Sequence, residues 1–296
     1  MERRIDLHMH SNISDGVLTP KELIDTAKEN GVDTICIADH DILDAYTDDL
    51  FNYAKENNIN LIKGVEISTE DIVGVHVLGY NIDINNKELI DMLYRLRNAR
   101  HIYLHDVAKV LSDMGYKINV GKLDKVEAVT KAHISDDIVT NKENEKLLLA
   151  TIGHIPNRGE FIETIMNEGC PAYVKRASVT PREAANTIRK AGGKAVLAHP
   201  VGFKYEDNLD IDEVQRIVDD MNPDGIEAYY LYVDRYNNKI DEIDKWKSFA
   251  KKNNKFVTIG SDFHRIDGYK PEIGFVNWDI DISNQELEEI INNIIE

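Results

Sequence analysis

The sequence predicts an α/β protein whose strands run parallel. Short apolar runs alternate with amphipathic helical segments near both ends of the chain, and this β-α-β rhythm implies parallel strands joined by crossover helices. The 296 residues suffice for one large α/β domain, or for one such domain carrying an insertion. Ionisable residues stand where several apolar runs end, and in parallel sheets and barrels such ends collect on one rim.

Composition narrows the class of protein. The formal charge of −18 argues against a broad nucleic-acid-binding surface, although a short nucleic acid or a nucleotide could still bind at a local site. The two cysteines lie far apart in the sequence, so no disulfide framework or zinc-finger spacing is present. No signal-peptide core or run of transmembrane length is present, so we expect a cytoplasmic protein with no membrane partner. The oligomeric state does not follow from the sequence.

The first predicted strand carries two histidines. Residues 5–9 alternate apolar and polar side chains, which is the period of an extended strand. His8 and His10 then share one face, about 6.5–7 Å apart along the strand, and can converge on one metal ion. A turn through Ser14-Asp15-Gly16 carries the Asp15 carboxylate back toward the strand end. Taken alone, the pair could equally be two histidines on a partly exposed strand.

The first βα units follow in order. Thr19-Pro20-Lys21-Glu22 is a typical helix start, with a cap, a proline at the first helical position and an acidic first turn. Asn30-Gly31 ends this helix, and a buried strand over 34–38 leads to His40. The pattern then predicts a helix over 46–57, strands over 60–63 and 64–68 with Glu66, and a strand over 76–80 that begins at His76.

From about residue 85 the pattern becomes helical. Apolar residues between Leu89 and Leu111 recur at helical spacing through a charged stretch, and Gly115-Tyr116 breaks the pattern. Residues 118–168 hold few convincing strand runs. We therefore predict a β/α domain interrupted by a mainly helical insertion, over residues 1–84 with 177–296 and over residues 85–176, respectively.

The βα rhythm returns after the insertion. Thr180-Pro181-Arg182-Glu183 is a second capped helix start, and Gly192-Gly193 ends that helix. A strand over 194–198 leads to His199. The remaining predicted elements are a strand over 225–229, a helix over 238–253, a strand over 256–260 that leads to Asp262 and His264, and an amphipathic helix from Asn284.

Nine ionisable residues in six separate segments stand near strand ends. One such segment could be structural, but burying so many charged groups without partners would be costly, and metal ions accept both imidazole and carboxylate ligands. The set is too large for one ion, so we predict two or three divalent ions. The candidate ligands are His8, His10, Asp15, His40, Glu66, His76, His199, Asp262 and His264.

These motifs resemble the PHP (polymerase and histidinol phosphatase) superfamily of metal-dependent phosphoesterases. The segments that carry the resemblance are Asp6-Leu7-His8-Met9-His10-Ser11, Ser14-Asp15-Gly16, Ala38-Asp39-His40-Asp41, Gly64-Val65-Glu66-Ile67-Ser68, Ala198-His199-Pro200 and Ser261-Asp262-Phe263-His264. The resemblance implies a distorted seven-stranded β/α barrel of TIM-like type, with the insertion capping the metal rim.

The insertion is similar to the nucleoside 3',5'-bisphosphate phosphatase branch, whose members also trim RNA from its 5' end. The similar segments are Leu96-Arg97-Asn98-Ala99-Arg100, Ala132-His133-Ile134 and Gly169-Cys170-Pro171-Ala172-Tyr173-Val174-Lys175-Arg176. Two departures fall in the same region, where Lys131-Ala132-His133 replaces the usual Arg-Pro-His and the run from Lys142 to Glu160 is longer.

The resemblance also implies how the metals are held. His8, His10, Glu66 and Asp262 would hold one ion, Glu66 would bridge to a second ion on His76 and His199, and Asp15, His40 and His264 would hold the third. Asp39 and Asp41 would orient a ligand histidine. Manganese is the first choice of metal, with iron or zinc as alternatives, because mixed histidine and carboxylate sites accept all three.

The function implied is hydrolysis of the 3'-phosphate of nucleoside 3',5'-bisphosphates, with trimming of short 5'-phosphorylated RNA as a second activity. Metal coordination lowers the pKa of water from about 15.7 toward about 7, which makes hydroxide available as the nucleophile. Asp262 belongs to the catalytic group, and either a metal ion or a protonated histidine, His199 or His264, would assist the leaving oxygen. The alternatives are a phosphatase of the histidinol phosphate type and a metal-binding regulatory module without turnover.

Substrate contacts are expected from the insertion, because a second phosphate needs fixed positive donors outside the metal site. The candidates are Arg100, His133, Lys175 and Arg176. Tyr173, Tyr229 and Tyr230 could stack a base or pack in the core.

Overall fold

The computed structural model describes residues 3–69, 74–206, 208–234, 237–266 and 268–296. The chain divides into two compact units. The first unit comprises Met1–Leu93 and Val179–Glu296, and the second comprises Tyr94–Ser178. That the inserted segment caps the metal rim stays a prediction.

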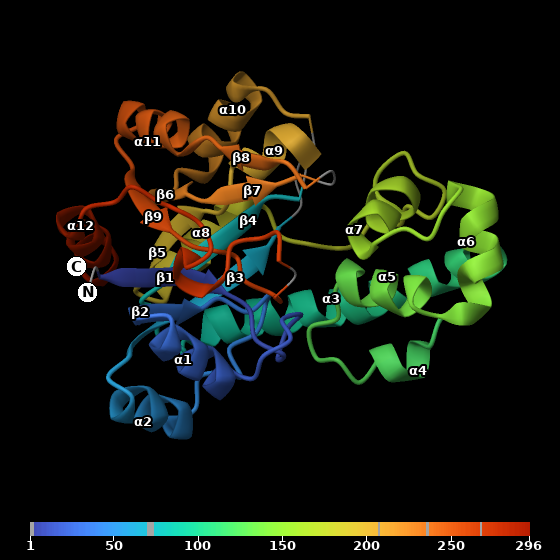
Figure 1. The fold of residues 1–296 in the computed structure, drawn as a ribbon, viewed down its shortest axis with the longest axis horizontal. Coiled ribbons are helices and arrows are strands. Elements are labelled where there is room, and N and C mark those ends of the chain that lie inside the picture. The colour runs from blue at the N-terminus through green and yellow to red at the C-terminus, as the bar shows by residue number, and fades with distance from the viewer. Residues whose placement is uncertain (1–2, 70–73, 207, 235–236, 267) are drawn as a thin grey trace. The chain divides into compact units, whose positions relative to one another are not determined.

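A seven-stranded sheet forms the centre of the first unit (Figure 1). The sheet curls into a half-barrel with the strand order β1-β2-β3-β4-β5-β6-β9, which confirms the predicted seven-stranded α/β fold. Its strands are β1 Arg4–Met9, β2 Val32–Ile37, β3 Asn60–Ser68, β4 His76–Tyr80, β5 Lys194–Leu197, β6 Gly225–Tyr229 and β9 Phe256–Ile259.

The two edges of this sheet meet at one rim. Met9 forms an isolated parallel bridge with Phe263, and the His10 amide donates to the Phe263 carbonyl over 2.9 Å. The Asp262 amide donates to the His8 carbonyl over 2.8 Å. These backbone bonds fix the segment after β9 beside the end of β1, although the two are far apart in the sequence.

One strand runs against the expected direction. β4 pairs antiparallel with both β3 and β5, whereas the other neighbouring strands of the sheet are parallel. The prediction of parallel strands is therefore wrong for β4. Only residues 69–75 separate β3 from β4, and a parallel crossover needs roughly a dozen residues or more.

Helices pack along the sheet within the first unit. α1 (Pro20–Glu29) packs on β2, and α8 (Pro181–Lys190) packs on β4 and β5. Both predicted helix starts are confirmed, because Thr19 and Thr180 each form a capping box with the glutamate three residues later. The other helices are α2 Asp48–Glu56, α9 Val201–Glu206, α10 Ile211–Met221, α11 Ile243–Lys252 and α12 Asn284–Ile295.

Part of the predicted helix over 238–253 is wrong. Lys239–Asp241 forms strand β8, which pairs antiparallel with β7 (Leu231–Val233), and α11 begins only at Ile243. Asp234 closes this hairpin by accepting hydrogen bonds from the amide and the side chain of Asn238. The hairpin is set by pairing with a segment that follows β6, which helical periodicity alone does not reveal.

The second unit consists of helices around its own apolar core. The long helix α3 (Lys87–Asp113) crosses from the first unit into the second. The shorter helices are α4 Val120–Leu123, α5 Lys131–Val139, α6 Glu145–Ile152 and α7 Arg158–Phe161. Their core includes Leu104, Ile134 and Phe161, each fully buried.

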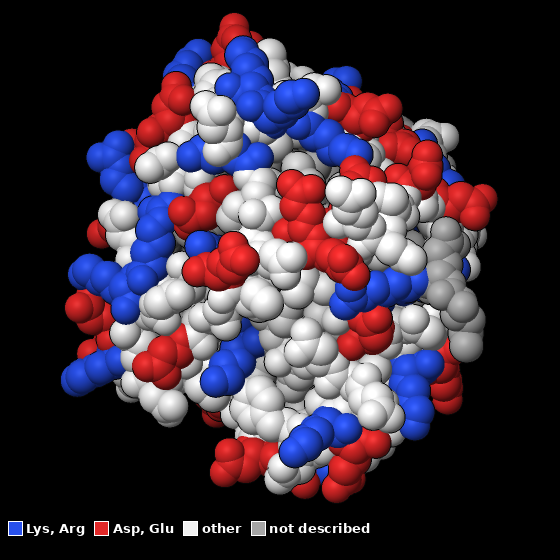
Figure 2. All heavy atoms as spheres, turned by 90° about the vertical axis from the view of Figure 1, so that its left-hand side faces the viewer, with Lys and Arg blue, Asp and Glu red and all other residues white. Residues whose placement is uncertain are grey.

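Surface charge and helix composition bear on the partners. Within the part of the chain that the structure describes, no helix combines the length and apolar character needed to span a membrane. On the face drawn in Figure 2, Lys and Arg side chains are interspersed with Asp and Glu side chains. Over the whole chain the 53 Asp and Glu residues outnumber the 35 Lys and Arg residues, which gives the formal charge of −18.

The C-terminal helix α12 is linked to β6 and α11 through the Glu286 carboxylate. Glu286 on α12 accepts hydrogen bonds from Lys247 Nζ and the Tyr229 hydroxyl, both over 2.9 Å. The Lys247 ammonium lowers the pKa of Glu286 from 4.5 to about 2. Because the folded pKa is the lower one, Glu286 stabilises the fold above pH 4.5, and this contribution is lost as the pH falls toward 2.

Replacing Glu286 with Gln should lower the free energy of unfolding at pH 7 by about 0.5–1 kcal/mol, a small value because the pair is partly exposed to solvent. The difference between variant and wild type should shrink as the pH falls from 4.5 to 2. Urea unfolding across that range measures it, with the exposed Glu289 on the same helix, replaced by Gln, as the control. An unchanged difference at low pH would contradict the assignment.

Candidate metal centre

His8 in β1 and His10 just after it are fully buried and face each other. Their Nε2 atoms lie 3.1 Å apart, as expected for two ligands aimed at one point. A register shift between Asp6 and Met9 marks a bulge in the pairing of β1 with β2. Bulges re-aim side chains, and Leu7 and Met9, which would share one face of a regular strand, pack in different hydrophobic clusters.

The Glu66 carboxylate on β3 lies among five imidazole rings. It is 1% exposed, and its two oxygen atoms face different histidines. Oε1 lies 2.9 Å from His76 Nδ1 and 3.0 Å from His199 Nε2, whereas Oε2 lies 3.0 Å from His40 Nδ1, 3.3 Å from His10 Nε2 and 3.4 Å from His8 Nε2.

The direction of β4 explains why His76 joins this group. Because β4 is antiparallel, its first residue lies at the rim, where His76 pairs with Ser68 at the end of β3. His76 Nδ1 lies 3.3 Å from His199 Nε2, so Glu66, His76 and His199 form a compact trio. His199 follows β5 with a left-handed φ of 26°, a strained conformation of the kind that occurs at functional sites.

Asp262 supplies a second carboxylate, partly exposed, beside His8 and His10. Its Oδ1 lies 3.1 Å from His10 Nε2 and 3.5 Å from His8 Nε2. Its Oδ2 accepts a hydrogen bond from the Tyr230 hydroxyl over 3.1 Å. Asp262 also has a left-handed φ, of 52°. The loop after β9 thus places a carboxylate against the histidines of the opposite sheet edge.

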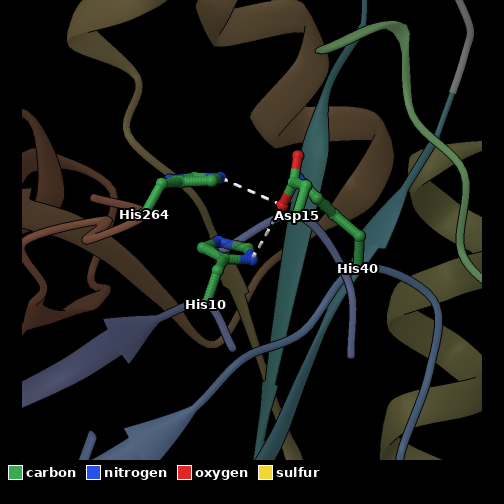
Figure 3. A group of neighbouring side chains, drawn as sticks. All are labelled: His10, Asp15, His40 and His264. Carbon is green, nitrogen blue, oxygen red and sulfur yellow. Dashed lines mark ion pairs between the residues drawn. The ribbon is translucent and has the colours of Figure 1, made fainter. Parts of the chain in front are cut away.

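A third group surrounds Asp15 (Figure 3). Asp15 Oδ1 lies 3.2 Å from His264 Nε2 and 3.8 Å from His10 Nδ1. Asp15 Oδ2 lies 3.9 Å from His40 Nε2. His40 therefore stands between two carboxylates, with one ring nitrogen toward Glu66 and the other toward Asp15.

Charges in the centre are tightly linked. Burial alone would lower the pKa of His10, but the Asp262 and Glu66 carboxylates outweigh burial and raise it to about 10. Burial also opposes protonation of His199, yet Glu66 raises its pKa to about 9. The imidazoles around Glu66 and Asp262 hold the pKa of both carboxyls well below their usual range despite burial. A metal cation would therefore displace protons on binding.

The donor set fits divalent metal ions. Within the described residues, the buried atoms His10 Nδ1, Asp15 Oδ1 and Glu66 Oε2 have no hydrogen-bond partner. Bonds of 2.0–2.1 Å in a tetrahedral site imply about 3.3–3.4 Å between ligand atoms, close to the spacing of the rim donors. Three groups could each hold an ion, namely His10 with Asp15, His40 and His264, His8 with His10 and Asp262, and His40 with Glu66 and His76.

Glu227 on β6 is a buried partner that the sequence analysis missed. Its carboxylate oxygens lie 3.0 and 3.2 Å from His8 Nδ1, and Oε2 accepts the His199 backbone amide over 2.8 Å. A side chain at Gly260 would put its Cβ 2.4 Å from Glu227 Oε1, so only glycine leaves room there. An acidic residue inside the apolar run 225–229 was the available signal.

Two neighbouring aspartates hold backbone segments that carry residues of the centre. Asp39 was expected to orient a ligand histidine, but its carboxylate accepts hydrogen bonds from the Ser11 amide and from the Ser11 and Ser14 hydroxyls, over 2.6–2.7 Å. It therefore holds the turn that presents Asp15. Asp41 Oδ1 accepts the Ser68 amide over 2.9 Å and so supports the end of β3.

The predicted substrate residues all belong to the second unit. Arg100 is 4% exposed and donates to the Val129 carbonyl, which is the contact of a structural residue. His133 completes the capping box of α5 by accepting the Thr130 amide through Nδ1. Lys175 is exposed and Arg176 is partly exposed.

Residues 6–167 match the family model for the PHP domain. This chain belongs to the PHP domain family. It is 31% identical over 265 residues to a 5'-3' exoribonuclease of Haemophilus influenzae, covering 89% of this chain and 91% of that protein. It is 26% identical over 265 residues to a 3',5'-nucleoside bisphosphate phosphatase of Chromobacterium violaceum, covering 88% and 87%.

A solved structure supports the fold of this PHP protein. A protein of Bifidobacterium adolescentis, proposed to be a metal-dependent phosphoesterase, superposes with a TM-score of 0.77 at 22% identity. The match covers 100% of this chain and 97% of the other. At that identity the likeness shows a shared fold.

Glu227 gives a testable prediction for the PHP centre. Replacing Glu227 with Gln should weaken manganese binding to the metal-free protein by about 10- to 100-fold, because ligand histidines depend on their hydrogen-bond partner for orientation and basicity. Calorimetric titration measures the affinity, and the thermal unfolding of the metal-free variant checks its fold. The matched control is Glu56→Gln on the exposed side of α2. An affinity equal to wild type would refute a supporting role for Glu227.

Proposed function

We propose that this PHP-family protein hydrolyses the 3'-phosphate of nucleoside 3',5'-bisphosphates and trims short 5'-phosphorylated RNA. It is a hydrolase of phosphate ester bonds, the class shared by its phosphatase and exoribonuclease relatives. Two or three divalent ions serve as cofactors, with manganese as the proposed metal and iron or zinc as alternatives.

One observation carries this proposal, namely that a single buried carboxylate, Glu66, turns one oxygen toward His76 and His199 and the other toward a second set of histidines. Such a carboxylate can bridge neighbouring cations. Paired cations are suited to phosphate esters, because both the attacking and the leaving oxygen develop negative charge.

The proposed ligand assignment divides the rim donors so that each histidine serves one ion. His8, His10, Glu66 and Asp262 would hold one ion, Glu66 with His76 and His199 a second, and Asp15, His40 and His264 a third. When bound, these ions would neutralise the phosphoryl oxygens and lower the pKa of a water molecule. Asp262 has two proposed roles, as a ligand of the first ion and as a catalytic residue. The Tyr230 hydroxyl holds its carboxylate in place.

Exposure separates the rim histidines that solvent reaches from those that it does not. The side chains of His76, His199 and His264 are 28%, 18% and 13% exposed, whereas His8 and His10 are fully buried. His264 Nδ1 lies 2.9 Å from the Asp262 carbonyl oxygen, which fixes Nδ1 as the donor and aims Nε2 at Asp15. Of the three exposed histidines, His199 and His264 are the proposed groups that assist the leaving oxygen, with a metal ion as the alternative.

Recognition of the second phosphate is assigned to the second unit. Lys175 and Arg176 are the stronger candidates, because their exposure leaves them accessible to an anionic ligand. Arg100 and His133 remain proposed substrate residues. The hydrogen bonds described for them, to Val129 and Thr130, lie within the second unit and support its fold.

Phosphate release from three substrates tests the proposed function. The manganese-loaded protein should hydrolyse adenosine 3',5'-bisphosphate and a 5'-phosphorylated oligoribonucleotide with a higher kcat/KM than histidinol phosphate. A preference for histidinol phosphate would contradict the proposed substrate class but not the proposed metal-dependent hydrolysis. No release from any substrate would favour a metal-binding module without turnover.

Loss of one rim ligand should abolish this activity. His10→Ala and Asp262→Ala should each lower kcat by about 100-fold or more, because charge stabilisation at the phosphoryl group is lost. His105→Ala, which removes an exposed histidine of α3, is the matched control and should keep wild-type turnover. Circular dichroism checks that the folds are intact. Wild-type activity in either rim variant would contradict the proposed role of that residue in metal-dependent hydrolysis.

A further inference from the structure

A row of tyrosine rings leads away from the metal centre within the first unit. Tyr230 is the first of them, since its hydroxyl donates to Asp262 and its ring centre lies 5.5 Å from that of His199. Tyr230 directly precedes β7, and Tyr232 follows within that strand, two residues further along the chain.

Tyr205 completes the row from a different segment. It lies on α9, which begins two residues after His199, and its ring stacks on that of Tyr232 with centres 5.5 Å apart and planes 17° apart. The three residues Tyr230, Tyr232 and Tyr205 are called the tyrosine row below. Both chain segments that form it start at residues of the metal centre, so its position relative to that centre is fixed by short connections.

The outer end of the row combines an aromatic ring with positive charge. Tyr205 is 39% exposed, and Lys204 Nζ lies 4.9 Å from its ring centre. The Lys204 side chain is 54% exposed, and its Nζ lies 3.6 Å from Glu242 Oε1, to which the Tyr205 hydroxyl also donates over 3.3 Å. Sites for single-stranded nucleic acids combine these two features, because bases stack on aromatic rings while cations follow the phosphates. A nucleobase is joined to its phosphates through one sugar ring, so a phosphate at the metal centre places the base nearby.

We propose that the Tyr205–Tyr232 pair is a base-stacking subsite, which makes the protein select phosphate esters that carry a nucleobase. The inference rests on the proposed function and deepens it, because it assigns base recognition to the first unit. Tyr230 is a positioning residue that connects the subsite to Asp262. Lys204 would contact the phosphate of an adjoining nucleotide.

A purely structural role is the competing explanation. In that case the Tyr205–Tyr232 stack would only hold the β7–β8 hairpin against α9, and its loss would affect all substrates alike. A stacking subsite instead predicts an effect that depends on the presence of a base. Tyr205→Leu separates the two, because leucine keeps an apolar contact with Tyr232 and removes the aromatic surface. Tyr205→Phe is the conservative control.

The test compares manganese-loaded wild type and variants on adenosine 3',5'-bisphosphate and on ribose 3,5-bisphosphate, which has the same phosphates and no base. Tyr205→Leu should raise KM for the base-bearing substrate about tenfold with little change in kcat, and should leave both constants for the abasic substrate unchanged. Tyr205→Phe should behave as wild type. Equal changes on both substrates, or no change on either, would overturn the subsite.

A binding measurement keeps the inference testable if neither substrate is hydrolysed. A 5'-phosphorylated oligoribonucleotide containing 2-aminopurine should lose fluorescence on binding to the metal-loaded wild type, because stacking quenches this base. Tyr205→Leu should remove the quenching, and Tyr205→Phe should retain it. Turnover failure with quenching present would count against the proposed function alone, whereas absent or unaltered quenching would count against the subsite.

Discussion

The Glu66 carboxylate is the group on which the arrangement of the rim depends. It is buried among five imidazoles, and an ionised carboxylate in such a place is stable only with compensating positive charge. Protonated histidines can provide that charge without a metal, which the raised pKa of His10 and His199 reflects. Divalent cations would provide it in the loaded enzyme, and the same carboxylate would then define the spacing between neighbouring ions.

The fold brings this carboxylate and its partners together through a few departures from regular structure. The antiparallel direction of β4 places His76 at the rim, and the bulge in β1 separates the side chains of Leu7 and Met9. Left-handed backbone at His199 and Asp262 re-aims two more donors. Each of these irregular features lies at a residue of the metal centre. Irregular or strained backbone is expected at functional sites, where the position of a side chain matters more than regular secondary structure.

Much of the fold and the donor set was predictable from the sequence, since strand ends, capping boxes and the spacing of His8 and His10 are local signals. The direction of β4 was missed although its signal is local, since residues 69–75 between β3 and β4 are too few for a parallel crossover. Glu227 escaped notice because its role as partner of His8 exists only once β6 lies near β1. The β7–β8 hairpin and the stack of Tyr205 on Tyr232 are also long-range pairings, which helical or strand periodicity does not encode.

We propose that Glu66 bridges cations at a centre of two or three metals. Counting metal ions per chain in manganese-loaded wild type and in Glu66→Gln, by native mass spectrometry, tests it most directly. We predict two or three ions in the wild type and at least one fewer in the variant, because the group of His40, Glu66 and His76 loses its carboxylate whereas the other two groups contain no Glu66. The same number of ions in both proteins would contradict the account.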